Sequence, residues 1–127
     1  MKNIIVRNTS QTPIYQQLYE QISSQIINGD IAGDEVLPSM RTIAKELRVS
    51  IITIKKTWEL LEQGGFIYTV KGKGSYVKEN SQQKLKEKKI DAVKSLLQDS
   101  LVTCKEYGLS TTELIAIVTT MYDNIDD

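Results

Sequence analysis

Two cationic segments carry side chains that could bind the phosphates and base edges of a nucleic acid. The first opens with Ile51-Ile-Thr-Ile-Lys-Lys56, and the second is Lys71-Gly-Lys-Gly74. Lysine ammonium groups pair with phosphates, threonine hydroxyls hydrogen-bond to base edges, and isoleucine methyls pack against thymine methyls in a major groove. Glycines in the second segment allow a phosphate chain to approach the backbone closely. These residue types favour base reading by the first segment and phosphate binding by the second.

The chain offers little for catalysis or metal binding. It contains no histidine and a single cysteine, Cys104, so the commonest general base and zinc ligand is missing. The turn that contains Lys73 resembles a phosphate-binding loop, but Lys73 is followed by Gly74 instead of serine or threonine. We therefore expect no enzymatic activity, no metal and no cofactor.

The formal net charge of the 127 residues is zero, but the charge is unevenly distributed. Eight basic and three acidic residues between positions 36 and 78 give that stretch +5, whereas six lysines and eight acids from position 81 onward give −2. Positive charge is thus concentrated where phosphates would bind. No apolar run approaches the roughly 20 residues of a membrane span, and a lone cysteine agrees with a reducing compartment. We expect a cytoplasmic protein with no membrane partner.

Two short helices must position the first segment. Ser39 and Ser50 are the expected N-caps, because a serine hydroxyl accepts from the free amides of a first helical turn. The second helix is expected to run to about Gln63, since the two glycines that follow tolerate the left-handed conformation that ends helices. The spacing therefore predicts a helix-turn-helix.

The second of these helices has a predicted inward face and two apolar residues outside it. The inward face comprises Ile54, Thr57, Trp58 and Leu61. Ile51 and Ile52 lie in the first turn, off that face. They either meet thymine methyls in DNA or belong to the core or to a protein contact.

A β-hairpin is expected after the helix-turn-helix. Phe66–Val70 and Ser75–Lys78 are β-branched and aromatic runs on either side of the glycine-rich turn Lys71–Gly74, which is a hairpin signal. Ile31–Val36 is expected to be a loop with a short strand that pairs with this hairpin. A hairpin with lysines at its tip, placed after a helix-turn-helix, is interpreted as a DNA-binding wing.

An additional helix is predicted near the start of the chain, after an extended segment of residues 1–11. Thr12 is its expected cap, with Pro13 in the first turn, where the missing amide costs nothing. Its apolar stripe repeats every four residues: Ile14, Leu18, Ile22 and Ile26.

Many positions match a known pattern in order and spacing, over roughly residues 10–78. They are Leu37-Pro-Ser39, Arg41, Ala44, Leu47, Val49-Ser50, Thr53, Leu61, Gly65-Phe-Ile67 and Lys71-Gly-Lys-Gly-Ser-Tyr-Val77. This pattern resembles the DNA-binding domain of the GntR family of bacterial transcription regulators. The short chain and the opening Pro13-Ile-Tyr-Gln-Gln17 are similar to its YtrA-type subfamily.

The resemblance implies DNA contacts at Arg41, Thr53, Lys55 and Gly72. Many family members carry arginine where this chain has Ile51, so a different operator sequence is implied. YtrA-type regulators often control their own operon, often one that encodes an ABC transporter, and the resemblance implies such a target. The residues expected at DNA are Ser39, Arg41, Ser50, Ile51, Ile52, Thr53, Lys55, Lys56, Lys71, Gly72 and Lys73.

Two further helices are predicted after the hairpin. The first should run from about residue 81 to Tyr107 and end at Gly108, with its lysine-rich start forming a solvated face: Lys84, Lys86, Lys88 and Lys89. Ser110 and Glu113 form an expected capping box for the second. Their surplus apolar surface should pair with a second chain, although folding back onto the same chain is an alternative. The expected dimer contacts are Ile90, Val93, Leu97, Leu101, Leu114, Ile117, Val118 and Met121.

The sequence is therefore interpreted as mainly α with a small β-hairpin. A winged helix-turn-helix (residues 1–78) precedes a two-helix dimerisation hairpin (residues 79–127). We expect a homodimeric repressor that binds double-stranded DNA at a palindromic operator, with room for an unknown small-molecule effector. The alternative is a winged-helix protein-interaction module, in which Ile51 and Ile52 contact a partner protein.

Overall fold

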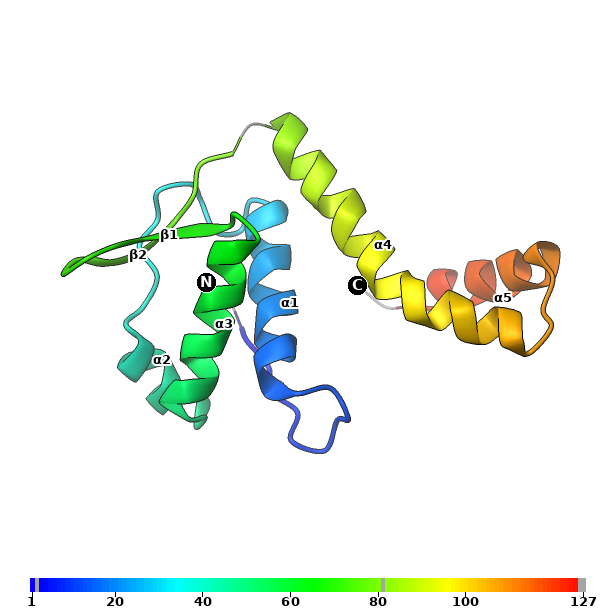
Figure 1. Cartoon of the computed structure of the whole chain (residues 1–127), viewed down its shortest axis with the longest axis horizontal. Helices are drawn as coiled ribbons and strands as arrows, with labels where there is room; N and C mark the ends of the chain where they lie inside the picture. The colour runs from blue at the N-terminus through cyan, green and yellow to red at the C-terminus, as the bar shows by residue number, and fades with distance from the viewer. Residues whose placement is uncertain (2, 81, 126–127) are drawn as a thin grey trace. The chain divides into compact units, whose positions relative to one another are not determined.

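The computed structural model describes residues 1, 3–80 and 82–125, and Figure 1 shows its elements. In chain order they are α1 (Ile14–Ile27), α2 (Met40–Leu47), α3 (Ile51–Gln63), β1 (Ile67–Val70), β2 (Gly74–Val77), α4 (Gln82–Glu106) and α5 (Thr111–Asp123). They divide into two compact units, Met1–Lys89 and Ile90–Asp127. The first unit is a winged helix-turn-helix, and the second contains most of α4 and all of α5.

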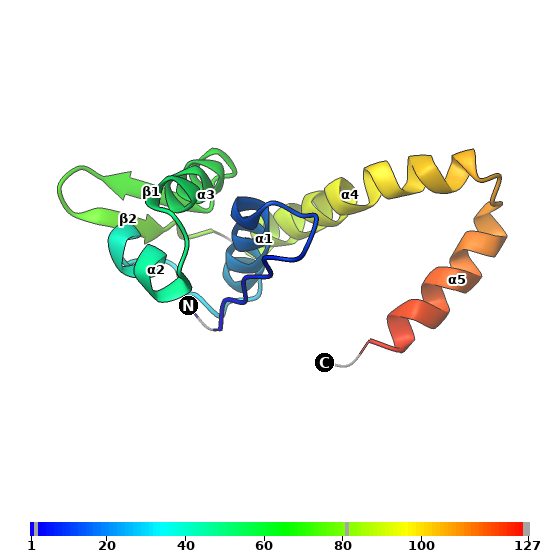
Figure 2. The ribbon, with the colours of Figure 1, turned by 90° about the horizontal axis from the view of Figure 1, so that it is seen from below.

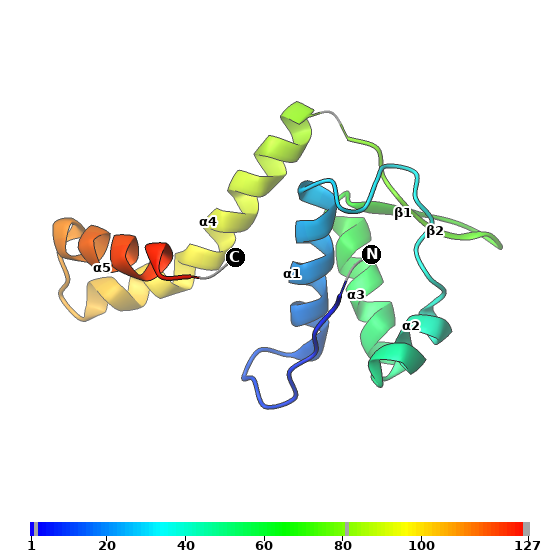
Figure 3. The same cartoon turned by 180° about the vertical axis from the view of Figure 1, so that it is seen from behind.

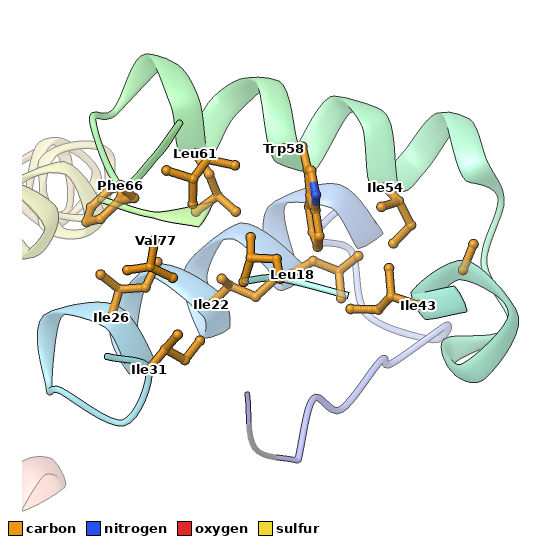
Figure 4. Close-up of a cluster of buried hydrophobic side chains, with 13 residues drawn as sticks. Leu18, Ile22, Ile26, Ile31, Ile43, Ile54, Trp58, Leu61, Phe66 and Val77 are labelled. Carbon is orange, nitrogen blue, oxygen red and sulfur yellow. The ribbon is translucent and has the colours of Figure 1, made fainter. Parts of the chain in front are cut away.

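The core of the first unit lies between α1 and α3, which run side by side in Figures 1 and 3. The buried face of α1 consists of residues at i+4 spacing: Leu18, Ile22 and Ile26. The facing stripe of α3 is the predicted one: Ile54, Thr57, Trp58 and Leu61. Figure 4 shows Trp58 and Leu61 pointing from α3 into this cluster. The buried hydroxyl of Thr57 donates to the Thr53 carbonyl at 2.9 Å, so its burial leaves no unmade hydrogen bond.

Both predicted serine caps of the helix-turn-helix are confirmed. Ser39 Oγ accepts from the Thr42 amide at 3.1 Å, and Ser50 Oγ accepts from the Thr53 amide at 3.1 Å. Arg48, which ends α2, adopts a left-handed φ of 57°. The chain therefore turns sharply between the two helices, and each helix begins at its serine.

The predicted start of α1 is wrong by one residue. Its N-cap is Pro13, not Thr12, and no side chain caps the first turn. Pro13 has φ −55° and ψ 147°, an extended conformation that its ring favours and that a cap residue requires. Thr12 consequently lies one residue too early to reach the free amides of α1.

Gln17 and Gln21 hold the segment before α1 along that helix. Gln17 accepts from the Arg7 amide at 2.9 Å and donates to the Arg7 carbonyl at 3.0 Å. Gln21 makes the same pair of bonds with Ile5, at 2.9 and 2.7 Å. Each side-chain amide thus makes the pair of hydrogen bonds that the backbone of an adjacent strand would otherwise make. The segment is therefore held in place although it belongs to no helix or sheet.

β1 and β2 form an antiparallel hairpin in which Tyr68 lies opposite Tyr76. The pairing predicted between the preceding loop and this hairpin is confirmed as a single β-bridge between Val36 and Tyr76. The Val77 amide also donates to the Glu35 carbonyl at 2.8 Å. The segment that leads into α2 therefore supports one edge of the hairpin.

The expectation of a solvated lysine face at the start of α4 is wrong for Lys88. Its ammonium donates to the carbonyl oxygen of Gly64, which ends α3, and lies 4.6 Å from the centroid of the Phe66 ring. The side chain is half-buried. Carbonyl groups at the C-terminus of a helix attract a cation, which explains why a lysine is stable there.

The predicted boundary between α4 and α5 is confirmed. Gly108 follows α4 with a left-handed φ of 80°. Ser110 Oγ accepts from the Glu113 amide, and the Glu113 carboxylate accepts from the Ser110 amide, both at 3.2 Å. This second bond lowers the pKa of Glu113. The predicted start of α4 near Ser81 lies outside the described residues.

Much of the apolar stripe of α4 and α5 remains exposed. The exposed fraction is 42% for Leu101 and 65% for Met121. Figure 2 shows α4 and α5 diverging from the turn that joins them, which agrees with this exposure. No described helix has the length and apolarity that a membrane crossing requires.

Two isoleucines of α3 provide a test of the core. Ile54→Ala is expected to lower the free energy of unfolding by about 2–5 kcal/mol, because it leaves a cavity against α1. Ile52→Ala removes the same atoms from an exposed site and should change it by less than about 0.5 kcal/mol. Urea titration of both variants measures the difference. Equal losses would contradict the assigned direction of the α3 face.

Candidate nucleic-acid interface

The first turn of α3 presents two isoleucines to solvent. Ile51 is 48% exposed and Ile52 is 80% exposed, whereas Ile54 is completely buried. The face that packs on α1 begins at Ile54, so the first two side chains contribute little to the core. Covering such groups with a partner is favourable by about 25 cal/mol for each Å² of apolar surface removed from water.

The hydroxyls of Ser50 and Thr53 are bonded to each other at 2.9 Å. Ser50 also accepts from the Thr53 amide, so the N-cap of α3 fixes the orientation of the half-buried Thr53 side chain. A hydroxyl has one donor and two acceptor positions, and this pair therefore retains capacity for a base edge or a phosphate.

The structure separates the two lysines of α3. Lys55 is exposed, three residues along the helix from Ile52 and hence on a neighbouring part of its surface. The Lys56 ammonium lies 4.0 Å from the centroid of the Tyr15 ring, in a cation–π contact with α1. Lys56 is thus oriented by the first helix, whereas Lys55 extends from α3 into solvent.

The first turn of α2 contributes Ser39 and Arg41. Arg41 is exposed, and the Ser39 hydroxyl donates to Thr42 Oγ1 at 2.7 Å while it caps the helix. In Figures 1 and 3, α2 and the hairpin turn extend from α3 toward the same side, away from α1. The predicted residues of α2 and of the hairpin are therefore brought to one side of α3.

The tip of the hairpin is a tight turn with two exposed lysines. The Lys73 amide donates to the Val70 carbonyl at 2.9 Å, which closes the turn. Gly72 has φ +80°, a conformation that residues with a Cβ rarely adopt, and a Cβ built there would meet nothing within 4 Å. Glycine at this position keeps the backbone of the tip open to a phosphate chain, with Lys71 and Lys73 on either side of it.

A tyrosine pair supports the hairpin behind this tip. Tyr68 and Tyr76 stack with their ring centroids 5.6 Å apart, and the Tyr68 hydroxyl donates to Asp34 Oδ1 at 3.2 Å. Desolvation and this bond to a carboxylate raise the pKa of Tyr68. The tyrosine hydroxyl therefore remains a neutral donor, and the hairpin is tied to the loop that precedes α2.

The arrangement combines exposed methyl groups, hydroxyls and cations on the helix-turn-helix and the hairpin. This combination suits a nucleic acid, because the cations can pair with its phosphates while the methyl groups contact apolar groups on its base edges. Among the described residues, no group of three or more His, Cys, Asp or Glu side chains could hold a metal ion. The predicted dimer residues belong to α4 and α5 in the second unit.

Sequence comparison finds relatives of this architecture. The model of the bacterial regulatory proteins of the gntR family matches residues 14–77, from α1 to β2. The chain is 30% identical to the transcriptional repressor YtrA of Bacillus subtilis over 105 residues, which cover 83% of this chain and 81% of YtrA. It is 36% identical to the repressor NagR of the same organism over 72 residues, which cover 57% of this chain but only 30% of NagR.

Solved structures agree with the sequence relatives. A GntR family transcriptional regulator from Listeria monocytogenes has a TM-score of 0.72 and 29% identity, over 87% of this chain and 96% of that one. The DNA-binding domain of AraR in complex with operator ORX1 has a TM-score of 0.54 and 30% identity, over 61% of this chain and 99% of that domain. The first similarity extends over most of the chain, and the second covers a smaller part of it.

Proposed function

The chain belongs to the GntR family of bacterial regulatory proteins, and we propose that it is a homodimeric repressor of transcription that binds a palindromic operator. The observation that carries the proposal is the family match over residues 14–77, which include both the exposed turn of α3 and the lysine-tipped hairpin. YtrA is itself a transcriptional repressor, and the AraR domain was solved on operator DNA. The exposed groups described above are of the kinds that such a complex uses.

In this proposal residues 1–78 read DNA and residues 79–127 pair two chains. Base recognition is assigned to Arg41, Ile51, Ile52, Thr53 and Lys55. Contacts to the phosphate backbone are assigned to Ser39, Ser50, Lys56, Lys71, Gly72 and Lys73. Ile51 replaces the arginine that many family members carry, so the half-site should contain thymine methyls where those members contact guanine.

Pairing of two chains is supported by the exposed apolar stripe of the second unit. In the single chain the exposed fraction of the side chain is 42% for Leu101 and 65% for Met121, and a second copy would remove that surface from water. Two copies would also place two reading units on DNA, with half-sites about 34 Å apart along the duplex.

The regulated target is proposed by analogy with YtrA-type members to be an operon that encodes an ABC transporter. Sequencing of the genomic fragments that the protein retains would identify the target. Recovery of unrelated promoters alone would contradict this part of the proposal.

Lys73 tests whether the hairpin binds phosphate. Duplexes selected from a random pool supply the operator, and the dissociation constant is measured across salt concentrations. Lys73→Ala should weaken binding to all sequences and reduce the slope of log affinity against log salt by about one unit. Lys86→Ala, at an exposed lysine of α4, is the matched control.

An unchanged slope in Lys73→Ala would show that the hairpin tip does not touch phosphate. If the pool gave no enriched duplex and the protein instead captured a partner protein without salt dependence, the alternative of a protein-interaction module would be favoured.

Deoxyuridine substitution tests whether Ile52 contacts a thymine methyl. Replacing one contacted thymine by deoxyuridine removes a methyl group and leaves base pairing intact. Wild-type affinity should fall about fourfold, which corresponds to ~0.8 kcal/mol for one buried methyl-sized group. Ile52→Ala should lose a similar amount on the natural operator and then be insensitive to the same substitution. Equal sensitivity of both proteins at every thymine would argue against the contact.

Leu101 tests the pairing of chains. Leu101→Glu places a charge in the exposed stripe of α4 and should give a monomer in sedimentation experiments. Affinity for a two-half-site operator should fall at least about 100-fold, because linked binding of two modules is lost. Ser95→Glu, at an exposed residue off the stripe, should change neither property. A wild-type protein that sediments as a monomer would refute the dimer.

A further inference from the structure

We propose that Lys88 is a positioning residue for DNA reading, although it lies outside the helix-turn-helix and outside the residues that the family model matches. The inference rests on the proposed function and adds a residue of α4 to it. Lys88 would act through the turn that joins the recognition helix α3 to the hairpin, not by touching DNA.

Two contacts of Lys88 are with that turn. Its ammonium donates to the Gly64 carbonyl and lies over the Phe66 ring at 4.6 Å from the centroid. Both contacts are within the first compact unit, which extends to Lys89. A half-buried ammonium that donates to a carbonyl oxygen and lies over an aromatic face is held more firmly than a solvated lysine.

The turn at Gly64–Phe66 sets the direction in which the chain leaves α3. Gly65 has φ +74°, and the Phe66 amide returns to the Leu61 carbonyl at 2.9 Å, so the helix ends within one turn. The Lys78 amide then donates to the Phe66 carbonyl at 2.8 Å, which joins the turn to the end of the hairpin. The angle between recognition helix and hairpin is therefore determined at these residues.

The Lys88 ammonium occupies the space beside Gly65. A Cβ built on Gly65 would lie 2.9 Å from the Lys88 ammonium, a distance that real Cβ atoms essentially never show. Glycine is favoured there by its backbone conformation, and a side chain at this position would displace the lysine tip from its contacts. The partial negative charge at the C-terminus of α3 also favours an ammonium at this point.

Lys88 is in the wrong place to bind the phosphates next to the recognition turn. α3 contains 13 residues and is therefore about 20 Å long, and Lys88 lies at the end opposite to Ile51 and Ile52. Removing its charge should accordingly affect binding through geometry and leave the number of released counterions unchanged.

Lys88→Met in the full chain tests the inference, because methionine keeps much of the apolar stem and removes the ammonium. Affinity for the selected operator should fall about threefold to tenfold, which lies within the roughly twofold to thirtyfold range found for residues that act through others. The salt slope and the dimer should be unchanged. Lys88→Arg should restore most of the affinity, and Lys89→Met, at the exposed neighbouring lysine, is the matched control.

A second measurement reports the contact directly. The chain contains a single phenylalanine, so its ring resonances in an NMR spectrum belong to Phe66. They should shift in Lys88→Met and stay in place in Lys89→Met.

Three outcomes would overturn the role of Lys88. The first is equal operator affinity of Lys88→Met and Lys89→Met. The second is a salt slope reduced by about one unit in Lys88→Met, which would indicate a phosphate contact. The third is Phe66 resonances that do not shift in Lys88→Met. In each case a wild-type protein that binds its operator with steep salt dependence would leave the proposed function intact. A wild-type protein that binds no duplex would instead refute the proposed function itself.

Discussion

The packing of α3 against α1 is the interaction on which the rest of the structure depends. Burial of Ile54, Trp58 and Leu61 against the i+4 stripe of α1 fixes the rotation of α3 about its own axis. That rotation leaves the first turn, with Ile51 and Ile52, facing solvent. A helix of 13 residues would be only marginally stable alone, so its tertiary contacts both form it and decide which side chains it presents.

The hairpin is positioned by contacts at its edge and at its base. Along one edge, the loop before α2 pairs with β2 at Val36 and Tyr76. At its base, the Gly64–Phe66 turn connects it to α3, and Lys88 contacts that turn from α4. A two-stranded hairpin is at best marginally stable in water by itself. These supports therefore give the lysine-tipped turn a defined place relative to α3.

The two compact units divide the chemistry between them. The first carries exposed cations and methyl groups, and its apolar side chains are otherwise largely packed in one core. The second exposes an apolar stripe along α4 and α5 that the single chain does not cover. The proposed DNA reading by the first unit and the proposed pairing by the second use different surfaces, so the two proposals can be tested by different substitutions.

Local signals determined much of this protein from its sequence alone. Ser39, Ser50, Gly108 and the Ser110–Glu113 capping box act on residues within a few positions, so their spacing was sufficient to place the ends of four helices. The inward face of α3 followed from helical periodicity for the same reason. The start of α1 was misplaced because Pro13, through its own backbone, takes the position assigned to Thr12. Only the tertiary structure could bring Lys88 to Gly64, since 24 residues separate them and no periodicity relates a lysine to a distant backbone carbonyl.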